Sequence, residues 1–334
     1  MQMYTIPILY CPFTPFVHPL LNEIEEHTNQ WILDFRLTET YEKFVQYKKC
    51  RFASFIARSF PVGDFIDICA WADFNTLLFL VDDKFDEQDL IKDKKSFMRF
   101  EKDFMEVLEQ NKRCTIEKDG SILAAASDFW NRMLLRSSAS WQRKFIGCIQ
   151  QMFAGLYWQF ENILKGTDPN FDEYLEIRQY LGAAHLSTDS LEVTGKIFLP
   201  DEVYENPLVN KLTVICRNTV CFANDLFSLG KETEESQNAG DFNLVTLMKR
   251  KHNLTMEGAI EATAQFHDRL VRDFIDISRQ VFIYDDNTNK MLKQYIQALQ
   301  CQMIANIEWS TKETIRYPHI YGRQGQATNQ PFVK

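Results

Sequence analysis

Residues 77–86 read LLFLVDDKFD, an apolar run that ends in a cluster of acidic side chains. The apolar pattern reaches back to Asp64, a suitable N-cap that follows a Pro-Val-Gly turn. We therefore predict a helix from Asp64 to about residue 86, and because it is apolar nearly all round it belongs in the interior. Carboxylates that emerge from such a run cost free energy unless they are solvated, paired or bound to a metal ion.

The composition favours a fold built from long helices. The chain has 334 residues, of which 45% are hydrophobic and 13% aromatic, and only 12 are Gly and 10 Pro. Helical patterns cover residues 22–48, 94–111, 121–136, 138–165, 207–231, 256–282 and 286–309. A Pro-rich N-terminal arm (1–20), a loop at 234–241 and an irregular tail (317–334) complete an all-α, single-domain helical bundle spanning 1–334.

Charge and cysteine content narrow the class of protein. The net charge is −9 and the pI near 5.3, which argues against a nucleic-acid-binding surface. The eight cysteines show no metal-ligand spacing and indicate reduced core residues. The apolar runs are too short to span a bilayer, and residues 1–16 do not resemble a signal peptide. We expect a soluble, cytoplasmic protein with no nucleic-acid or membrane partner.

The acidic cluster of residues 82–86 has the spacing of a metal site. Asp82 and Asp86 lie at i and i+4 on one helix face, and Asp83 lies one step round. Magnesium prefers oxygen ligands and is usually held by a few carboxylates together with phosphate oxygens of a substrate. For this motif alone, a solvated acidic helix end explains the pattern equally well.

A second polar pattern occurs at residues 224–232, which read NDLFSLGKE. Asn224, Ser228 and Glu232 recur at steps of four and so line one side of a helix. An amide oxygen, a hydroxyl and a carboxylate there could form a three-oxygen magnesium site, with Lys231 beside it to meet a phosphate. Asn and Ser are mediocre helix formers, so their spacing needs a reason, although ordinary surface positions remain the alternative.

The two motifs together resemble those of class I terpene synthases of the short, single-domain microbial type. In that family the first Asp of the acidic motif binds two magnesium ions, and the Asn, Ser and Glu of the second motif bind a third. The resemblance implies three Mg²⁺ ions, with Mn²⁺ as a substitute, and the metal-site residues Asp82, Asp83, Asp86, Asn224, Ser228 and Glu232.

Further family features match along nearly the whole chain. An arginine that senses diphosphate lies 46 positions before the Asn of the second motif, which is Arg178 here. Gly182 matches a helix-break glycine near the reacting carbon, whereas Leu181 departs from the acidic or polar residue of some relatives. Arg316 and Tyr317 match a pair that binds diphosphate when the site closes.

The resemblance implies that a prenyl diphosphate is ionised while Arg178, Lys231 and Arg316 neutralise the leaving group. The cation then needs an apolar, water-poor and aromatic pocket. Aromatic residues are candidates for its wall, although core packing is the commoner role for any one of them, and we favour Phe79 and Trp309. The full set is Phe55, Phe79, Phe153, Tyr157 and Trp309.

Farnesyl diphosphate is the commonest substrate of chains with this resemblance, so sesquiterpene formation is expected, with geranylgeranyl diphosphate as the alternative. A prenyl-elongating synthase would carry a second D-D-x-x-D motif at residues 224–228, where this chain reads NDLFS. A non-catalytic helical binding protein is the alternative from another class. Antiparallel dimers occur in similar proteins, which makes a homodimer an open possibility.

Overall fold

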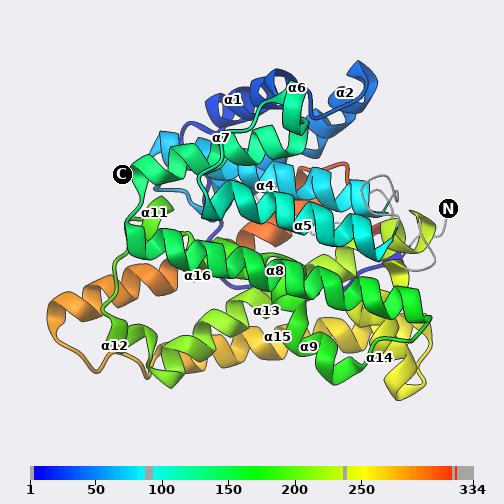
Figure 1. Cartoon of the computed structure of the whole chain (residues 1–334). Helices are drawn as coiled ribbons and strands as arrows, with labels where there is room; N and C mark the ends of the chain where they lie inside the picture. Colours follow the sequence, from blue (N-terminus) through cyan, green and yellow to red (C-terminus); the bar gives the residue numbers. More distant parts are fainter. Residues whose placement is uncertain (1–3, 87–92, 236–238, 318–319, 322–334) are drawn as a thin grey trace.

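The computed structural model describes residues 4–86, 93–235, 239–317 and 320–321, except for the side chains of 85–86, 234–235, 239–240 and 320–321 (Figure 1). The helices are α1 (Leu21–Asp34), α2 (Tyr41–Cys50), α3 (Phe52–Ser59), α4 (Phe65–Asp86), α5 (Lys94–Glu109), α6 (Ile116–Asp119), α7 (Ser121–Arg136), α8 (Ala139–Lys165), α9 (Phe171–Leu181), α10 (Ala184–Asp189), α11 (Leu191–Thr194), α12 (Asp201–Tyr204), α13 (Pro207–Glu235), η1 (Ala239–Phe242), α14 (Leu244–His252), α15 (Met256–Ser278) and α16 (Asp286–Lys312), and the strands are β1 (Tyr4–Thr5) and β2 (Ile320–Tyr321). The predicted all-α fold is confirmed.

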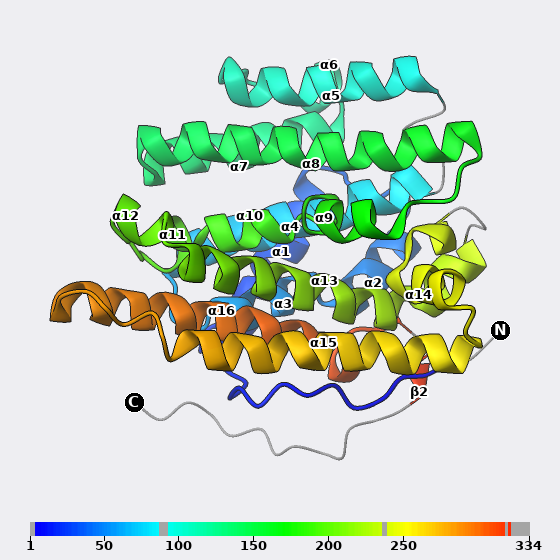
Figure 2. The same cartoon turned by 90° about the horizontal axis from the view of Figure 1, so that it is seen from below.

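The helices are stacked in layers, which Figure 2 shows clearly. Helices α5 and α6 lie at one edge, followed by α7 and α8, then α4 with α9 and α10, then α13, with α15 and α16 at the opposite edge. Helix α4 packs against α1, α3 and α7, and α13 packs against α9, α10, α15 and α16. The two helices that carry the polar motifs are therefore both interior helices.

Helix α4 can be buried because its acidic side chains have partners. Asp67 is fully buried and forms ion pairs with Arg136 and with Lys196. Asp73, also fully buried, accepts hydrogen bonds from Thr28 (2.8 Å) and Arg132 (2.8 Å). These contacts attach α4 to its neighbours along its length.

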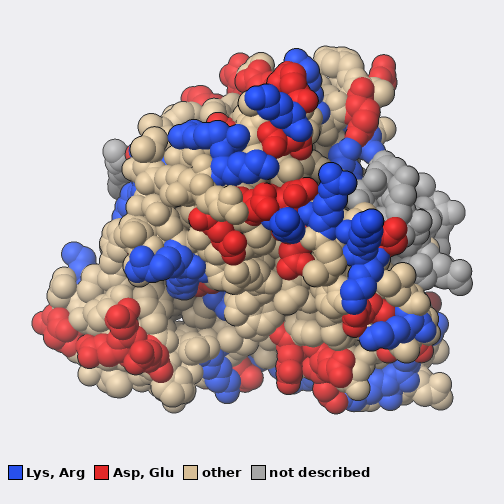
Figure 3. Space-filling view, viewed as in Figure 1, with Lys and Arg blue, Asp and Glu red and all other residues tan. Residues whose placement is uncertain are grey.

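The core is one cluster of apolar side chains that extends from Tyr4 to Tyr317. On the face shown in Figure 3, acidic and basic side chains are interspersed. Exposed ion pairs of this kind contribute little stability, so the fold depends on the core. All eight cysteines are free, as expected, and no described helix is long and apolar enough to cross a membrane.

Several predicted helix boundaries hold. Asp64 caps α4 by accepting from the backbone N–H of Ile66 (3.1 Å), and Thr255 caps α15 by accepting from Gly258 (3.1 Å). Helix α7 spans the predicted residues 121–136. Periodicity and capping residues are thus enough to predict the boundaries of these helices from the sequence.

Other boundaries differ from the prediction. The region 22–48 is two helices, α1 and α2, because Thr40 starts a new helix by accepting from Lys43 (3.2 Å). Helix α13 continues to Glu235 and η1 covers Ala239–Phe242, so helical structure occupies part of the stretch expected as a loop at 234–241, and α16 continues to Lys312. The tail is not wholly irregular, since β2 pairs in parallel with β1 of the N-terminal arm.

Candidate active site

A cavity of about 230 Å³ lies between α4, α13 and α16, with the break between α9 and α10 on one side. Its walls are largely apolar, and examples are Phe55, Ile56, Phe74, Leu78, Phe79 and Leu186. Asp82 and the polar residues of α13 line the same cavity. The structure therefore brings the two motifs, far apart in sequence, to one apolar chamber.

Asp83 joins the two motifs through ion pairs. It is buried, and Arg316 donates to both of its oxygens, from Nη1 (3.0 Å) and Nη2 (2.8 Å). Lys231 Nζ lies 3.3 Å from Asp83 Oδ1, and Tyr47 donates its hydroxyl proton to Oδ2 (3.1 Å). Although burial raises it, Arg316 and Lys231 hold the pKa of Asp83 at about 2. As placed, Asp83 is a charge partner for these cations and not an open metal ligand.

The other two acidic positions differ from Asp83. The Asp82 side chain is 59% exposed at the cavity and meets Arg316 Nη2 at 3.4 Å. Asp86 is the last residue of α4, but its side chain lies outside the described residues. Asp82 is therefore the carboxylate of this motif that is open to a ligand in the described part of the chain.

Arg178 lies in a buried network beneath the second motif. Its Nε (2.9 Å) and Nη2 (2.7 Å) donate to Asp225 Oδ1, and Nη2 also donates to Asn224 Oδ1 (3.1 Å). Burial lowers the pKa of Arg178, but the Asp225 carboxylate outweighs this and raises it above its usual value. A Cβ on Gly182 would lie 2.2 Å from Arg178 Nη1, so a glycine at 182 gives the guanidinium its room.

The three proposed ligands of the second motif lie on the cavity wall together. Asn224 donates from Nδ2 to the Tyr317 hydroxyl (2.8 Å). Glu232 accepts from Asn243 Nδ2 (2.9 Å), and burial, followed by the charge of Asp225, raises the pKa of Glu232 to about 7. Ser228 Oγ is buried and has no hydrogen-bond partner of ordinary geometry among the described residues.

These oxygens fit a hard divalent cation. A buried hydroxyl with no hydrogen bond of ordinary geometry and a carboxylate with a raised pKa both cost free energy, which a bound cation would recover. Among the described residues, no group of three or more His, Cys, Asp or Glu side chains could hold a metal ion. A site here must therefore use the amide and hydroxyl oxygens of Asn224 and Ser228.

The predicted aromatic residues divide into two groups. Phe55 and Phe79 line the cavity, with Phe79 stacked on Phe52 at 4.4 Å between ring centroids. Trp309 lies behind them, 5.5 Å from Phe55 and 5.6 Å from Phe79, and its Nε1 donates to the Cys50 carbonyl (3.0 Å). Trp309 is not among the residues that line this cavity, and its polar edge holds the joint between α2 and α3.

Phe153 and Tyr157 also fail as wall residues. Phe153 is buried against Phe100 and Phe104 of α5, and Tyr157 donates its hydroxyl proton to Glu161 (2.5 Å). Both therefore lie on the α5 side of α8. The adjacent face of α8, one residue round the helix, reaches the cavity instead, through Met152, Leu156 and Gln159. Proximity in sequence to a motif did not reveal which face of the helix was turned inward.

Sequence reasoning missed three residues that position the site. Asp225 holds Arg178, Tyr174 donates to Asp225 Oδ2 (2.7 Å), and Asn243 donates from Nδ2 to both the Asp225 carbonyl (2.7 Å) and Glu232. Tyr174 lies one turn before Arg178 on α9, which is a usable signal. Asn243 has no comparable signal, because its role depends on the fold.

We expect Phe79→Leu to change the ratio of products without a large loss of stability, since Phe79 lines the cavity. Phe153→Leu is the matched control, because Phe153 packs inside the core. It should cost about 1 kcal/mol of unfolding free energy and leave the product ratio unchanged. Gas chromatography of products and urea denaturation measure the two effects. A product change in Phe153→Leu equal to that in Phe79→Leu would contradict this division.

The raised pKa of Glu232 predicts a pH dependence of stability in metal-free protein. The folded state keeps a proton on Glu232 up to about pH 7, whereas the unfolded chain releases it near 4.5. The folded state thus binds more protons in this window, so stability falls as pH rises through it, by about 3 kcal/mol. Urea denaturation in EDTA at several pH values measures this fall, and Glu232→Gln should remove it. Identical pH slopes for both proteins would contradict the prediction.

Comparisons with known proteins agree on the family. A model of the family described as "Terpene synthase family 2, C-terminal metal binding" matches residues 73–273, more than half of the chain. Germacrene A synthase of Nostoc punctiforme is 25% identical over 96% of this chain and 97% of its own length. (+)-T-muurolol synthase of Roseiflexus castenholzii, named as cyclising (2E,6E)-farnesyl diphosphate, is 26% identical over 97% of each chain.

Solved structures show the same fold. The SVS_A2 protein from ancestral sequence reconstruction superposes with a TM-score of 0.79 at 21% identity, over 95% of this chain and 94% of its own. Hedycaryol synthase in complex with nerolidol gives a TM-score of 0.76 at 18% identity, over 92% of this chain and 100% of its own. At these identities the likeness is one of fold.

Proposed function

The chain belongs to terpene synthase family 2 and is a class I terpene synthase of the microbial type, and from this premise we propose that it ionises farnesyl diphosphate and cyclises the farnesyl cation to a sesquiterpene. As a terpene synthase it is a carbon–oxygen lyase that acts on prenyl diphosphates and uses a divalent metal. The finer proposal adds the substrate, the use of three magnesium ions and the roles of the residues below.

One observation carries the proposal. Arg178, Lys231 and Arg316 come from three separate segments of the chain, and all three line the cavity that holds Asp82, Asn224, Ser228 and Glu232. Fixed cations beside oxygen ligands for a metal make a binding site for a diphosphate. The apolar wall opposite them suits a hydrocarbon chain.

The residues of the chain have distinct roles in this proposal. Asp82 would hold magnesium at one motif, with Asp83 and Asp86 beside it, and Asn224, Ser228 and Glu232 would hold it at the other. Bound magnesium supplies positive charge that stabilises the leaving diphosphate. Arg178, Lys231 and Arg316 are oriented by carboxylates in the protein and add fixed positive charge toward the same leaving group.

The cavity wall then stabilises the cation and shields it from water. Phe55 and Phe79 present aromatic surface that stabilises positive charge and excludes water, which would otherwise quench the cation. Tyr317, buried beside Asn224, closes the cavity at the same end as Arg316. We assign Gly182 a role in making room for Arg178, as its close approach supports.

The relatives support farnesyl diphosphate as the substrate, since one is named for its cyclisation and another for germacrene A. The second motif supports cyclisation over chain elongation, because residues 224–228 read NDLFS and not D-D-x-x-D. Geranylgeranyl diphosphate has no specific observation in its favour.

The test is product analysis by gas chromatography with mass detection. Purified protein is incubated with geranyl, farnesyl or geranylgeranyl diphosphate, each with Mg²⁺ or with EDTA. We expect cyclic C15 products from farnesyl diphosphate only when Mg²⁺ is present. A cyclic C20 product would overturn the choice of substrate, linear elongated diphosphates would indicate an elongating synthase, and product formation in EDTA would overturn the metal dependence.

A further inference from the structure

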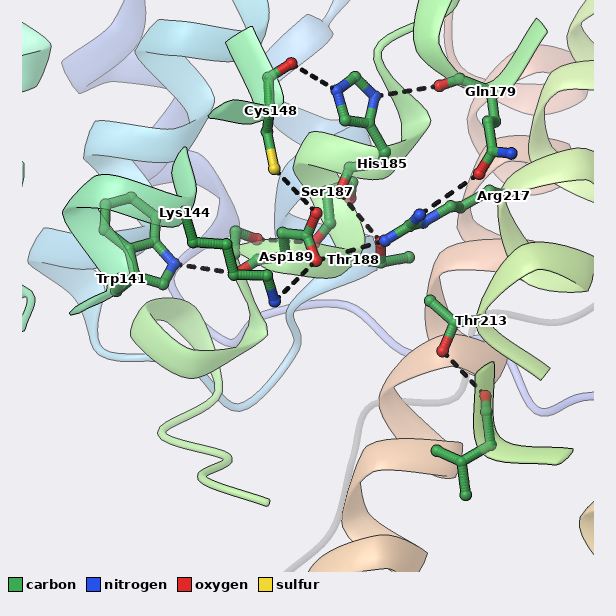
Figure 4. A network of polar contacts seen from close by, with 12 residues as sticks. Trp141, Lys144, Cys148, Gln179, His185, Ser187, Thr188, Asp189, Thr213 and Arg217 are labelled. Carbon is green, nitrogen blue, oxygen red and sulfur yellow. Dashed lines mark hydrogen bonds and ion pairs between the residues drawn. The ribbon is translucent and has the colours of Figure 1, made fainter. Parts of the chain in front are cut away.

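A second polar cluster, drawn in Figure 4, surrounds Arg217, which lines the cavity. We define this inner cluster as Lys144, Cys148, Gln179, His185, Thr188, Asp189 and Arg217. Arg217 lies on the same face of α13 as Asn224, seven residues before it, and both line the cavity. At about 1.5 Å per residue this places Arg217 about 10 Å deeper along the helix axis.

The guanidinium of Arg217 spans the break between α9 and α10. Its Nη1 donates to Gln179 Oε1 on α9 (3.3 Å), and its Nε donates to Thr188 Oγ1 on α10 (2.7 Å). Nη2 donates to Asp189 Oδ1, also on α10 (3.3 Å). Figure 4 shows Arg217 extended between these partners. One side chain of α13 is thus bonded to both sides of the break.

The break interrupts regular helix and needs such support. Ala183 has a left-handed backbone (φ 54°), and its N–H donates to Tyr180 (3.0 Å) instead of continuing the helical ladder. His185 contacts the Gln179 carbonyl through Nδ1 (3.1 Å) and the Cys148 carbonyl of α8 through Nε2 (2.7 Å). A non-glycine residue with positive φ persists only where its surroundings enforce it.

The break forms part of the cavity wall. Six of the residues that line the cavity come from this segment: Leu181, Gly182, Ala183, Ala184, Leu186 and Ser187. A small displacement of the break would therefore reshape the space in which the substrate chain folds. Packing in such a chamber is tight enough that small shifts select between competing outcomes.

The positive charge of Arg217 is paired with the carboxylate of Asp189, which Lys144 also contacts. Asp189 lies 3.3 Å from Arg217 Nη2 and 3.0 Å from Lys144 Nζ, and Cys148 Sγ donates to Asp189 Oδ2 (3.1 Å). Although burial raises it, Arg217 and Lys144 hold the pKa of Asp189 below its usual range. Lys144 pairs with Asp189 and lies over the Tyr204 ring (5.2 Å), and within the described residues it forms no hydrogen bond or ion pair with α9.

We propose that Arg217 is a specificity-determining positioning residue, which braces the α9–α10 break from α13 and so fixes the shape of the cavity wall at residues 181–187. A buried hydrogen-bonded charge contributes little net stability but can select one geometry of the chain. The effect of Arg217 on product specificity rests on the proposed cyclisation, whereas its bracing of the α9–α10 break does not.

The test compares Arg217→Lys with Lys144→Met. Arg217→Lys keeps a positive charge but loses the fork that bonds α9 and α10 together. Lys144→Met removes a partner of Asp189 and leaves that fork intact. With farnesyl diphosphate and Mg²⁺, we expect the ratio of the main product to the minor products to fall about tenfold in Arg217→Lys, more than the rate of diphosphate release changes. Lys144→Met should keep the ratio of the unaltered protein.

Amide hydrogen exchange measured without substrate tests the brace independently. Exchange at residues 181–187 should be faster in Arg217→Lys than in Lys144→Met. An unchanged product ratio in Arg217→Lys overturns the specificity role, and unchanged exchange overturns the brace. If the unaltered protein forms no cyclic product from any prenyl diphosphate, the proposed function fails, and the exchange result still decides whether Arg217 braces the break.

Discussion

Turnover of farnesyl diphosphate is expected to fall roughly a thousandfold in Glu232→Gln, with the helical fold retained. Glu232 is the only carboxylate among the three oxygen groups of Asn224, Ser228 and Glu232 on α13, and in the described residues its side chain accepts from Asn243 and forms no ion pair. An amide in its place keeps the shape and the bond to Asn243 but removes the negative charge that a divalent cation needs. Release of diphosphate, measured by a coupled assay, gives the rate.

The control is Thr233→Ala, one residue further along α13. Thr233 donates its hydroxyl proton to the Leu229 carbonyl (2.7 Å) and does not line the cavity. The turnover of Thr233→Ala should therefore stay within a few fold of that of the unaltered protein. Circular dichroism should show the same helix content for both variants. If Glu232→Gln turned over at near-normal rates at saturating Mg²⁺, Glu232 would not be a metal ligand, and the assignment of Asn224 and Ser228 would fail with it.

Helices with their own start signals could be predicted from the sequence. Helix α4 follows from a mostly apolar stretch and an N-cap, and α13 follows from its opening proline and four-residue spacing. The division between α1 and α2 was missed because apolar residues recur on both sides of it. The pairing of β1 with β2 was missed because strands of two residues carry no periodic signal.

The sequence could predict which residues belong to the candidate site, but not which of them form ion pairs with one another. Both motifs reach one cavity, as the family resemblance implied. That Asp83 pairs with Arg316 could not be read from the sequence, since 233 positions separate them. Trp309 and Phe153 show the same limit for packing. An aromatic residue is buried whether it lines the cavity or fills the core, and only the orientation of its helix decides between the two.

The second large effect is expected at Arg178, a buried cation of the site that is bonded to Asp225 and Asn224. Arg178→Lys keeps one positive charge but cannot bond Asp225 and Asn224 at the same time, as the guanidinium does. We expect turnover to fall about a hundredfold and the unfolding free energy to fall by about 3 kcal/mol, because Asp225 is fully buried and loses its bidentate partner.

The two parts of this effect can be separated with Tyr174→Phe, which removes the hydroxyl bonded to Asp225 Oδ2 and leaves Arg178 in place. That variant should lose about 1 kcal/mol of stability and only a few fold in turnover. Thermal shift with Mg²⁺ and inorganic diphosphate then tests ligand recognition: both the unaltered protein and Tyr174→Phe should be stabilised, and Arg178→Lys much less. Equal stabilisation of all three would mean that Arg178 only anchors Asp225, because a cation that receives the diphosphate cannot be weakened without weakening its binding.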